Sequence, residues 1–231
     1  MSKYIELLKN RPGYRHLWMA SVVSLFGDWF NSIASLIIVN RYTESGLAIS
    51  WILLARTLPR FFVGPFAGVI ADRFDRKKIL VIVDVLRSVI VLSFLYVDRP
   101  ERVWLIYALT IAQFIMASFF EPASSAMIPS LIKGNDELAT ANVLTSITWS
   151  TSLAVGAALG GGITAIFGAE NALIIDGFTF LVSAALILMV KSDKDFVEVD
   201  NSKVKEGMLT GLKKGFQYIV KNPSSGLLTL I

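Results

Sequence analysis

The feature that most constrains this chain is the length of its apolar blocks. Six of them contain about twenty residues or more, which is what an α-helix needs to cross about 30 Å of hydrocarbon. They occupy the ranges 17–40, 47–71, 79–97, 103–120, 138–167 and 172–190. The connections between them are short, so we expect consecutive helices to lie antiparallel and side by side. The sequence therefore predicts an all-α membrane protein, a bundle of six transmembrane helices.

The composition supports this class and excludes several others. The chain has 231 residues, of which 54% are hydrophobic and 17% charged, whereas a soluble domain carries about 25% charged residues. With no cysteine and one histidine, His16, neither a disulfide scaffold nor a metal centre is expected, and no motif suggests a cofactor. The net charge is +4, but the basic residues form no continuous patch, so we expect no nucleic-acid partner.

The basic residues predict the orientation in the membrane. Sixteen of the 22 lie in one set of segments: 1–16, 72–78, 121–137 and 191–222. Only three lie in the other set: 41–46, 98–102 and 168–171. Lysine and arginine are retained on the cytoplasmic side, so we expect a multi-pass protein of the cytoplasmic (inner) cell membrane with its N-terminus in the cytoplasm. Membrane lipid is thus an expected partner.

Four regions follow from these patterns. We expect a cytoplasmic N-terminus over 1–16, the six-helix bundle over 17–190, a cytoplasmic linker over 191–222 and the start of a truncated seventh helix over 223–231. Within the linker, apolar residues recur at helical spacing opposite lysines, which predicts an amphipathic helix. That helix would lie on the anionic membrane surface or on the cytoplasmic face of the bundle, and both alternatives remain open.

Five charged residues fall inside the predicted spans: Asp28, Arg56, Arg60, Asp84 and Arg87. A charge at the centre of a membrane helix costs about 2.5–3.5 kcal/mol on insertion scales, so each must pair or face water. Asp28 lies on one helix face with Asn31 and several serines, and such a stripe should line a cavity or a polar helix contact. Asp28 is therefore a candidate proton carrier, with a permanent ion pair to an arginine as the alternative.

The other charged residues suggest specific partners. Arg56 and Arg60 share a face of the second span, where Pro59 weakens the helix, and they need acids or an anionic ligand opposite. Asp84 and Arg87 stand three residues apart, which predicts an ion pair within their own helix. For Arg60, a role in the substrate pathway and a structural role are equally supported.

Three further features stand out, and the first two have both a structural and a functional interpretation. Gln113 could bind a ligand or join helices. Gly156 and Gly160 have the spacing that permits close helix packing, or a sliding surface in a protein that changes conformation. Asp176 should lie near the outer end of the sixth span, where its side chain can reach water.

The most specific motif is in the second connection. Residues 64–78 read Gly-Pro-Phe-Ala-Gly-Val-Ile-Ala-Asp-Arg-Phe-Asp-Arg-Lys-Lys and resemble the loop between helices two and three of the major facilitator superfamily, Gly-x-Leu-Ala-Asp-Arg-x-Gly-Arg-Lys. The matching positions are Gly68, Ala71, Asp72, Arg73, Arg76 and Lys77, while Asp75 replaces the second glycine. The resemblance implies that Gly68, Asp72, Arg73 and Arg76 belong to a cytoplasmic gate; the alternative is that the basic residues only anchor the loop in the cytoplasm.

Other segments resemble the bacterial drug-exporter branch of that superfamily, of the macrolide efflux and enterobactin exporter type. They are Phe26-Gly27-Asp28-Trp29, Leu58-Pro59-Arg60, Asp84-x-x-Arg87 and Phe119-Phe120-Glu121-Pro122-Ala123. Two features depart from its proton-coupled members: the fourth span has no arginine, and Ala157 stands where antiporters carry a proline. The resemblance implies the N-terminal half of a twelve-helix fold, completed by a missing C-terminal half or a second copy.

Three functions are therefore compared. The first is secondary active transport, with proton-coupled export of a small amphipathic substrate by alternating access. Its substrate and proton pathway would contain Asp28, Asn31, Arg56, Arg60, Asp84, Arg87 and Gln113. The second is a truncated half-transporter with no transport activity of its own. The third is a membrane-embedded enzyme, which the sequence disfavours because one histidine and no cysteine cannot supply a catalytic or metal-binding set.

Overall fold

The structure, a computed structural model, describes residues 3–191. The predicted linker helix and truncated seventh helix lie outside the described residues. The α-helices are α1 (Lys3–Asn10), α2 (Pro12–Thr43), α3 (Gly46–Arg73), α4 (Arg76–Ser93), α5 (Trp104–Met127), α6 (Gly134–Thr151), α7 (Ala157–Phe167) and α8 (Ala169–Leu188). Short helical turns are η1 (Phe94–Tyr96), η2 (Pro100–Arg102), η3 (Ile128–Ser130) and the π-helical η4 (Ser152–Gly156).

The prediction of six transmembrane helices is confirmed. Within the described residues, six helical stretches are long and apolar enough to cross a membrane. The first begins earlier than predicted, with Pro12 in its first turn, where a proline costs no hydrogen bond. The third begins at α4, whose N-cap is Asp75: its carboxylate accepts hydrogen bonds from the backbone N–H of Lys77 at 2.9 Å and of Lys78 at 3.2 Å. Asp75 therefore fixes the start of α4.

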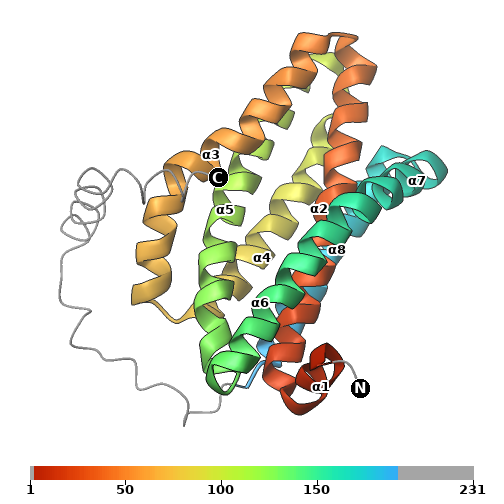
Figure 1. Cartoon of the computed structure of the whole chain (residues 1–231). Helices are drawn as coiled ribbons and strands as arrows, with labels where there is room; N and C mark the ends of the chain where they lie inside the picture. The colour runs from red at the N-terminus through yellow and green to blue at the C-terminus, as the bar shows by residue number, and fades with distance from the viewer. Residues whose placement is uncertain (1–2, 192–231) are drawn as a thin grey trace, which may run out of the picture.

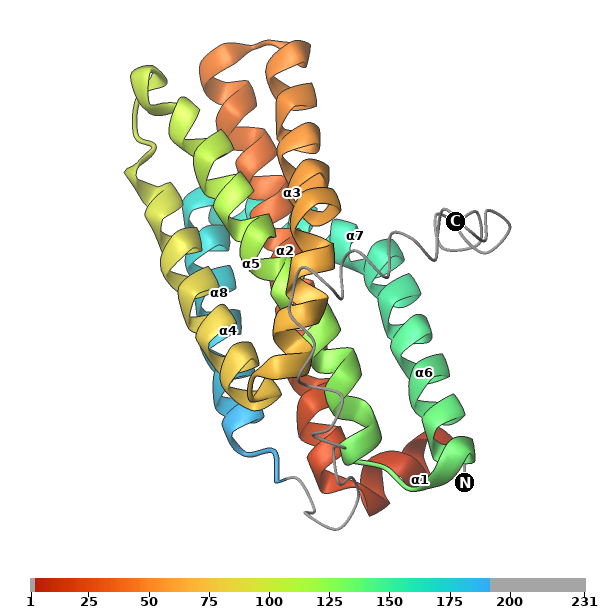
Figure 2. The same cartoon turned by 90° about the vertical axis from the view of Figure 1, so that its left-hand side faces the viewer.

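The order of the helices in the chain does not set which helices are neighbours. The most extensive contacts are those of α2 with α8, α3 with α5 and α4 with α8, whereas α2–α3 and α3–α4 touch only slightly. Figures 1 and 2 show α2, α4, α5 and α8 running side by side, with α6 standing apart from α5. The expectation that consecutive helices pack side by side was thus wrong for most pairs, because apolar area and small residues, rather than loop length, decide which faces meet.

The fifth span is joined to α2 by a tryptophan. A side-chain carbon at Gly156 would come within 2.6 Å of the Trp29 indole ring, and one at Gly160 within 2.8 Å of the Trp29 backbone oxygen. The indole Nε1 donates a hydrogen bond to Ser152 Oγ at 3.4 Å. Glycine at both positions gives Trp29 the space to lie against the fifth span, as small residues do in membrane helix packing.

The buried apolar side chains form two clusters, one at each end of the bundle. The cluster at the end occupied by α1 includes Tyr14, Leu17 and Leu80, and the opposite cluster includes Phe30 and Val91. Between these clusters, α2 and α4 carry a group of polar residues: Ser21, Ser24, Asp28, Asp84, Arg87 and Ser88. The bundle therefore has a polar layer between two apolar ones, and it is here that the site lies.

Candidate functional site

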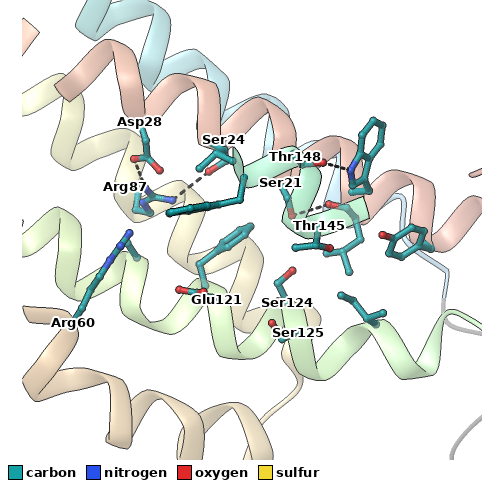
Figure 3. A pocket seen from close by; sticks show the side chains of 18 residues that line it. Ser21, Ser24, Asp28, Arg60, Arg87, Glu121, Ser124, Ser125, Thr145 and Thr148 are labelled. Carbon is teal, nitrogen blue, oxygen red and sulfur yellow. Dashed lines mark hydrogen bonds and ion pairs between the residues drawn. The ribbon is translucent and has the colours of Figure 1, made fainter. Parts of the chain in front are cut away.

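A pocket of about 370 Å³ opens between α2, α5 and α6. Its polar lining residues come from all three helices and from α3 and α4, as Figure 3 shows: Ser21, Ser24, Asp28, Arg60, Arg87, Glu121, Ser124, Ser125, Thr145 and Thr148. Its aromatic lining residues are Tyr14, Trp18, Phe120 and Trp149. A cavity with apolar walls and a few charged groups suits a small amphipathic molecule.

Two hydrogen bonds connect the pocket helices. Trp18 Nε1 of α2 donates to Thr148 Oγ1 of α6 at 2.9 Å, and Tyr14 Oη donates to the backbone oxygen of Ala141 at 3.1 Å. Both side chains reach across from α2, so α6 is held at this end of the bundle although its middle stands away from α5.

The strongest polar contact in the pocket wall is an ion pair between α2 and α4. Arg87 Nη2 lies 2.5 Å from Asp28 Oδ1, and Arg87 Nη1 donates to Ser24 Oγ at 3.2 Å. The Arg87 side chain is 3% exposed and that of Asp28 is 29% exposed. The Arg87 guanidinium also stacks on the Phe180 ring of α8, 4.1 Å from its centroid. Asp28 is thus the partner that solvent in the pocket can reach.

This pairing corrects one prediction. Arg87 pairs with Asp28 and not with Asp84, although the i, i+3 spacing had predicted Asp84 as its partner. Asp84 is completely buried, and neither of its carboxyl oxygens has a hydrogen-bond partner; Ser183 of α8 is its neighbour. Spacing along a helix makes a pair possible, but a carboxylate on a facing helix can bind the guanidinium end-on and is preferred here.

Asp176 corrects a second prediction. It was expected near the outer end of its span with access to water, yet it is completely buried. Because α8 begins at Ala169, Asp176 lies about 10 Å along the helix from its start, and it faces α2 at Gly27. A side-chain carbon at Gly27 would overlap Asp176 Oδ1 and Thr179 Oγ1. Glycine at position 27 thus lets Asp176 lie next to the Asp28–Arg87 pair.

The two arginines of α3 share an aromatic partner. The guanidinium carbons of Arg56 and Arg60 lie 5.4 and 5.2 Å from the Phe114 ring centroid, which is cation–π distance. Arg56 also donates a hydrogen bond to Ser32 Oγ. Arg60 is exposed and lines the pocket, whereas Arg56 does not. Of the two, only Arg60 can therefore contact a molecule in this pocket.

The polar stripe of α2 divides into two parts. Ser21, Ser24 and Asp28 line the pocket. Asn31 is 4% exposed and lies outside the pocket, where its side-chain oxygen accepts from Ser35 Oγ at 3.3 Å. Gln113 is 2% exposed and also lies outside the pocket. The structure thus places these two amides among packed helices and not on the pocket surface.

Two basic side chains of the connection between α3 and α4 donate hydrogen bonds to the backbone of distant segments. Arg76 Nη1 donates to the Ala126 backbone oxygen at 2.8 Å, and Lys77 Nζ donates to the backbone oxygens of Leu188 and Val190, each at 2.8 Å. Asp72 and Arg73 are exposed, and a side-chain carbon at Gly68 would meet nothing within 4 Å. Arg76 therefore holds α5, whereas Gly68, Asp72 and Arg73 lie at the surface.

Sequence analysis did not assign Glu121 to the site, and it placed Asp176 at the wrong depth. Glu121 lies in a segment that resembled the exporters, but only the structure places its carboxyl group in the pocket lining. Asp176 is the one charged residue between positions 171 and 190, and a lone charge in an apolar span was the signal that pointed to it. Its depth was misjudged because the start of α8 was placed three residues too late.

The six-helix bundle with a polar pocket between its helices has the architecture of a multi-pass membrane protein. Residues 8–227 match the family model described as "Transmembrane secretion effector". The chain belongs to this family of major facilitator superfamily transporters.

The relatives that the chain resembles are transporters and efflux proteins. It is 30% identical to "Uncharacterized MFS-type transporter YfiS" of Bacillus subtilis over 96% of this chain and 53% of the relative. It is also 30% identical to "Putative bacilysin exporter BacE" of the same organism, over 92% and 52%, and to "Macrolide efflux protein A" of Streptococcus pyogenes, over 62% and 36%. The chain spans about half the length of the first two. No solved structure matches it significantly.

Proposed function

We propose that this chain is half of a secondary active transporter that exports small amphipathic molecules in exchange for protons by alternating access. The observation that carries the proposal is the Asp28–Arg87 ion pair in the pocket wall, with Asp28 partly exposed to the pocket. A carboxylate that solvent reaches can take up a proton, and protonation removes the charge that holds Arg87. Proton binding would thus loosen the contact between α2 and α4.

The pocket lining supports the substrate class. Trp18, Phe120 and Trp149 offer apolar area, while Arg60 and Glu121 offer one charge of each sign. An amphipathic or zwitterionic molecule can satisfy both kinds of surface, whereas a purely hydrophilic one cannot. The printed names of two relatives, a bacilysin exporter and a macrolide efflux protein, support export as the direction.

The exposed positions of the α3–α4 connection support a second six-helix half as the partner. In transporters of two such halves, the substrate path lies between them. We propose that Gly68, Asp72, Arg73 and Arg76 form the gate on the cytoplasmic side, with the N-terminus in the cytoplasm of the cell membrane. Asp72 and Arg73 are exposed there and can make charge-assisted hydrogen bonds to the other half that break as the halves rock.

The test is transport in proteoliposomes. Flux of ethidium, labelled erythromycin and a labelled dipeptide is measured with and without a pH gradient, for the chain alone and for the chain joined to a second six-helix half. Asp28→Asn should abolish the flux that depends on the pH gradient, because the amide cannot exchange a proton. Asp98→Asn, in an exposed loop, is the matched control and should leave it unchanged. Undiminished gradient-driven flux in Asp28→Asn would exclude proton coupling through this residue.

The alternative function, a half-transporter without activity of its own, is decided by the same experiment. The pocket is formed by one bundle only, and half of the relatives' length is not represented in the chain. Flux through liposomes containing only the 231-residue chain would exclude the alternative. Flux that requires the second half would support it for the chain alone.

A further inference from the structure

Two carboxyl groups lie behind the pocket wall with unsatisfied oxygens. Asp84 of α4 and Asp176 of α8 are both completely buried, and neither lines the pocket. Both oxygens of Asp84 and Oδ2 of Asp176 have no hydrogen-bond partner, and the neighbouring Ser183 Oγ, also completely buried, has none either. Asp176 Oδ1 accepts one hydrogen bond, from Thr179 Oγ1 at 3.2 Å. Buried polar groups without partners are rare in folded proteins and call for an explanation.

Within residues 3–191, Arg87 is the cation whose charge acts on these two carboxyls. The Arg87 guanidinium acts on both Asp84 and Asp176, and so does the Asp28 carboxyl of α2. The buried residues of α5 include no charged side chain, and Arg56 of α3 faces Asp28. The charge of Arg87 thus acts on three carboxyls, of which Asp28 already forms an ion pair with it.

The number of charges limits the protonation states. If all three carboxyls were ionised, Asp28 would have Arg87 as its ion-pair partner and Arg56 facing it, whereas Asp84 and Asp176 would each be left without a paired cation. Removing even one such charge from water costs several kcal/mol, and a carboxyl in that position takes up a proton instead. The neutral acid also gains a donor, which an unpartnered hydroxyl such as that of Ser183 can accept.

We infer that Asp84 and Asp176 form a proton store behind the pocket, and that Arg87 controls it by changing partner. While Arg87 holds Asp28, both buried carboxyls keep their protons. In the exchange, one buried carboxyl gives its proton to Asp28 while the guanidinium moves from Asp28 to the carboxylate that remains. The total charge and the number of protons are unchanged. Asp28 then carries a proton that it can release to water in the pocket.

The buried position of Arg87 Nε supports this exchange. Nε is buried and has no partner while Nη1 and Nη2 are bonded to Ser24 and Asp28, so the guanidinium keeps a free donor. Asp84 lies one helical turn away on the same helix, within reach of an i, i+3 side-chain contact. The contact that the sequence predicted within α4 is, in this proposal, the second position of Arg87.

The experiment is infrared spectroscopy of the whole purified chain in lipid nanodiscs at pH 7. Protonated carboxyls give a C=O stretching band that shifts in D2O, whereas ionised surface carboxylates do not contribute to it. The wild-type chain should show this band, and Asp84→Asn and Asp176→Asn should each reduce its area by about half, because each removes one of two groups. Asp136→Asn, at an exposed position of α6, is the matched control and should leave the band unchanged.

The decisive variant is Asp28→Asn, which mimics protonated Asp28 and frees Arg87. It should lower the band by about half as Arg87 moves to one buried carboxyl, which then ionises. An unchanged band in folded Asp28→Asn would overturn the exchange, and no band in the wild type would overturn the store. The wild-type and Asp28→Asn spectra decide the question even if the asparagine variants of the buried acids fail to fold.

Sodium is the other possible occupant of such a site. Spectra are therefore recorded in sodium chloride and in choline chloride. A band that appears only without sodium would show that a sodium ion, and not protons, balances the carboxylates, and would overturn the proposal. The role of this exchange in transport rests on the proposed function, but the exchange itself does not. Flux that is independent of the pH gradient would refute proton coupling, whereas the infrared result would still show whether the buried carboxyls are protonated.

Discussion

The packed and the open sides of this bundle differ in how much of each helix is covered. In the most apolar stretches of α2 and α8, 44% of the residues are buried, against 17% in the span of α3 and 22% in the span of α6 and α7. The packed side, formed by α2, α4 and α8, contains the ion pair and both buried acids. The open side carries exposed residues such as Trp51, Phe61 and Trp149.

The charged side chains on the two sides differ in how tightly they are enclosed. On the packed side, Arg87 is enclosed by Asp28, Ser24 and Phe180, so its removal leaves buried charge uncompensated. On the open side, Arg60 is exposed and rests on one ring. Four substitutions, from the largest expected effect to the smallest, test whether the two sides differ in this way.

The largest effect is expected from Arg87→Ala. It removes the ion-pair partner of Asp28 beside two buried acids, and breaking a buried ion pair from one side costs about 3–5 kcal/mol. The melting temperature in detergent, followed by circular dichroism, should fall strongly. Arg60→Ala on the open side is the matched control and should cost less than about 1 kcal/mol, the range of an exposed cation–π contact. Equal losses in the two variants would contradict the distinction between the sides.

The next effect is expected from Gly156→Ala. The new methyl group would overlap the Trp29 indole, and forcing extra atoms into a packed interface costs about 1–3 kcal/mol. Thermal unfolding and the tryptophan emission spectrum both report the change, since Trp29 must move. Gly161→Ala, where a side-chain carbon meets nothing within 4 Å, should unfold like the wild type. A harmless Gly156→Ala would mean that Trp29 does not need this space.

A smaller effect is expected from Lys77→Met. It keeps the length of the side chain but removes the donor to the backbone oxygens of Leu188 and Val190, which is worth about 1 kcal/mol. Hydrogen exchange at the end of α8 should speed up while the rest of the bundle is unchanged. The control Lys78→Met, at an exposed position, should leave exchange there as in the wild type. A similar increase in both variants would mean that the loss of a positive charge from the loop, and not of these hydrogen bonds, causes the faster exchange.

The smallest effect on stability is expected from Gly68→Ala. Nothing lies within 4 Å of the added carbon, so the free energy of unfolding should change by less than about 0.5 kcal/mol. Flux by the chain joined to a second half should nevertheless fall, because we propose that this surface meets that half. Normal flux in Gly68→Ala would remove Gly68 from the proposed gate, and a large loss of stability would show that the surface is not open.

The fold could be predicted to a larger extent than the site. Six spans follow from local hydropathy, and the class of protein follows from the motif over 64–78. The candidate charges at 28, 60 and 87 do line one pocket, but Asn31, Arg56, Asp84 and Gln113 lie outside it. The spacing of residues therefore predicted correctly which side chains share a face of one helix. The packing of several helices decided which of these faces line the cavity.

The sequence by itself determined the six spans between residues 3 and 191, because each crossing depends only on the residues of one segment. It also located the charges that a membrane helix cannot leave unpaired. Tertiary structure alone decided their partners: Arg87 binds an aspartate 59 positions away rather than the one three positions away, and Asp176 is enclosed beside Gly27. Hydropathy is a property of a segment, whereas a partner depends on which distant backbones come close enough to meet.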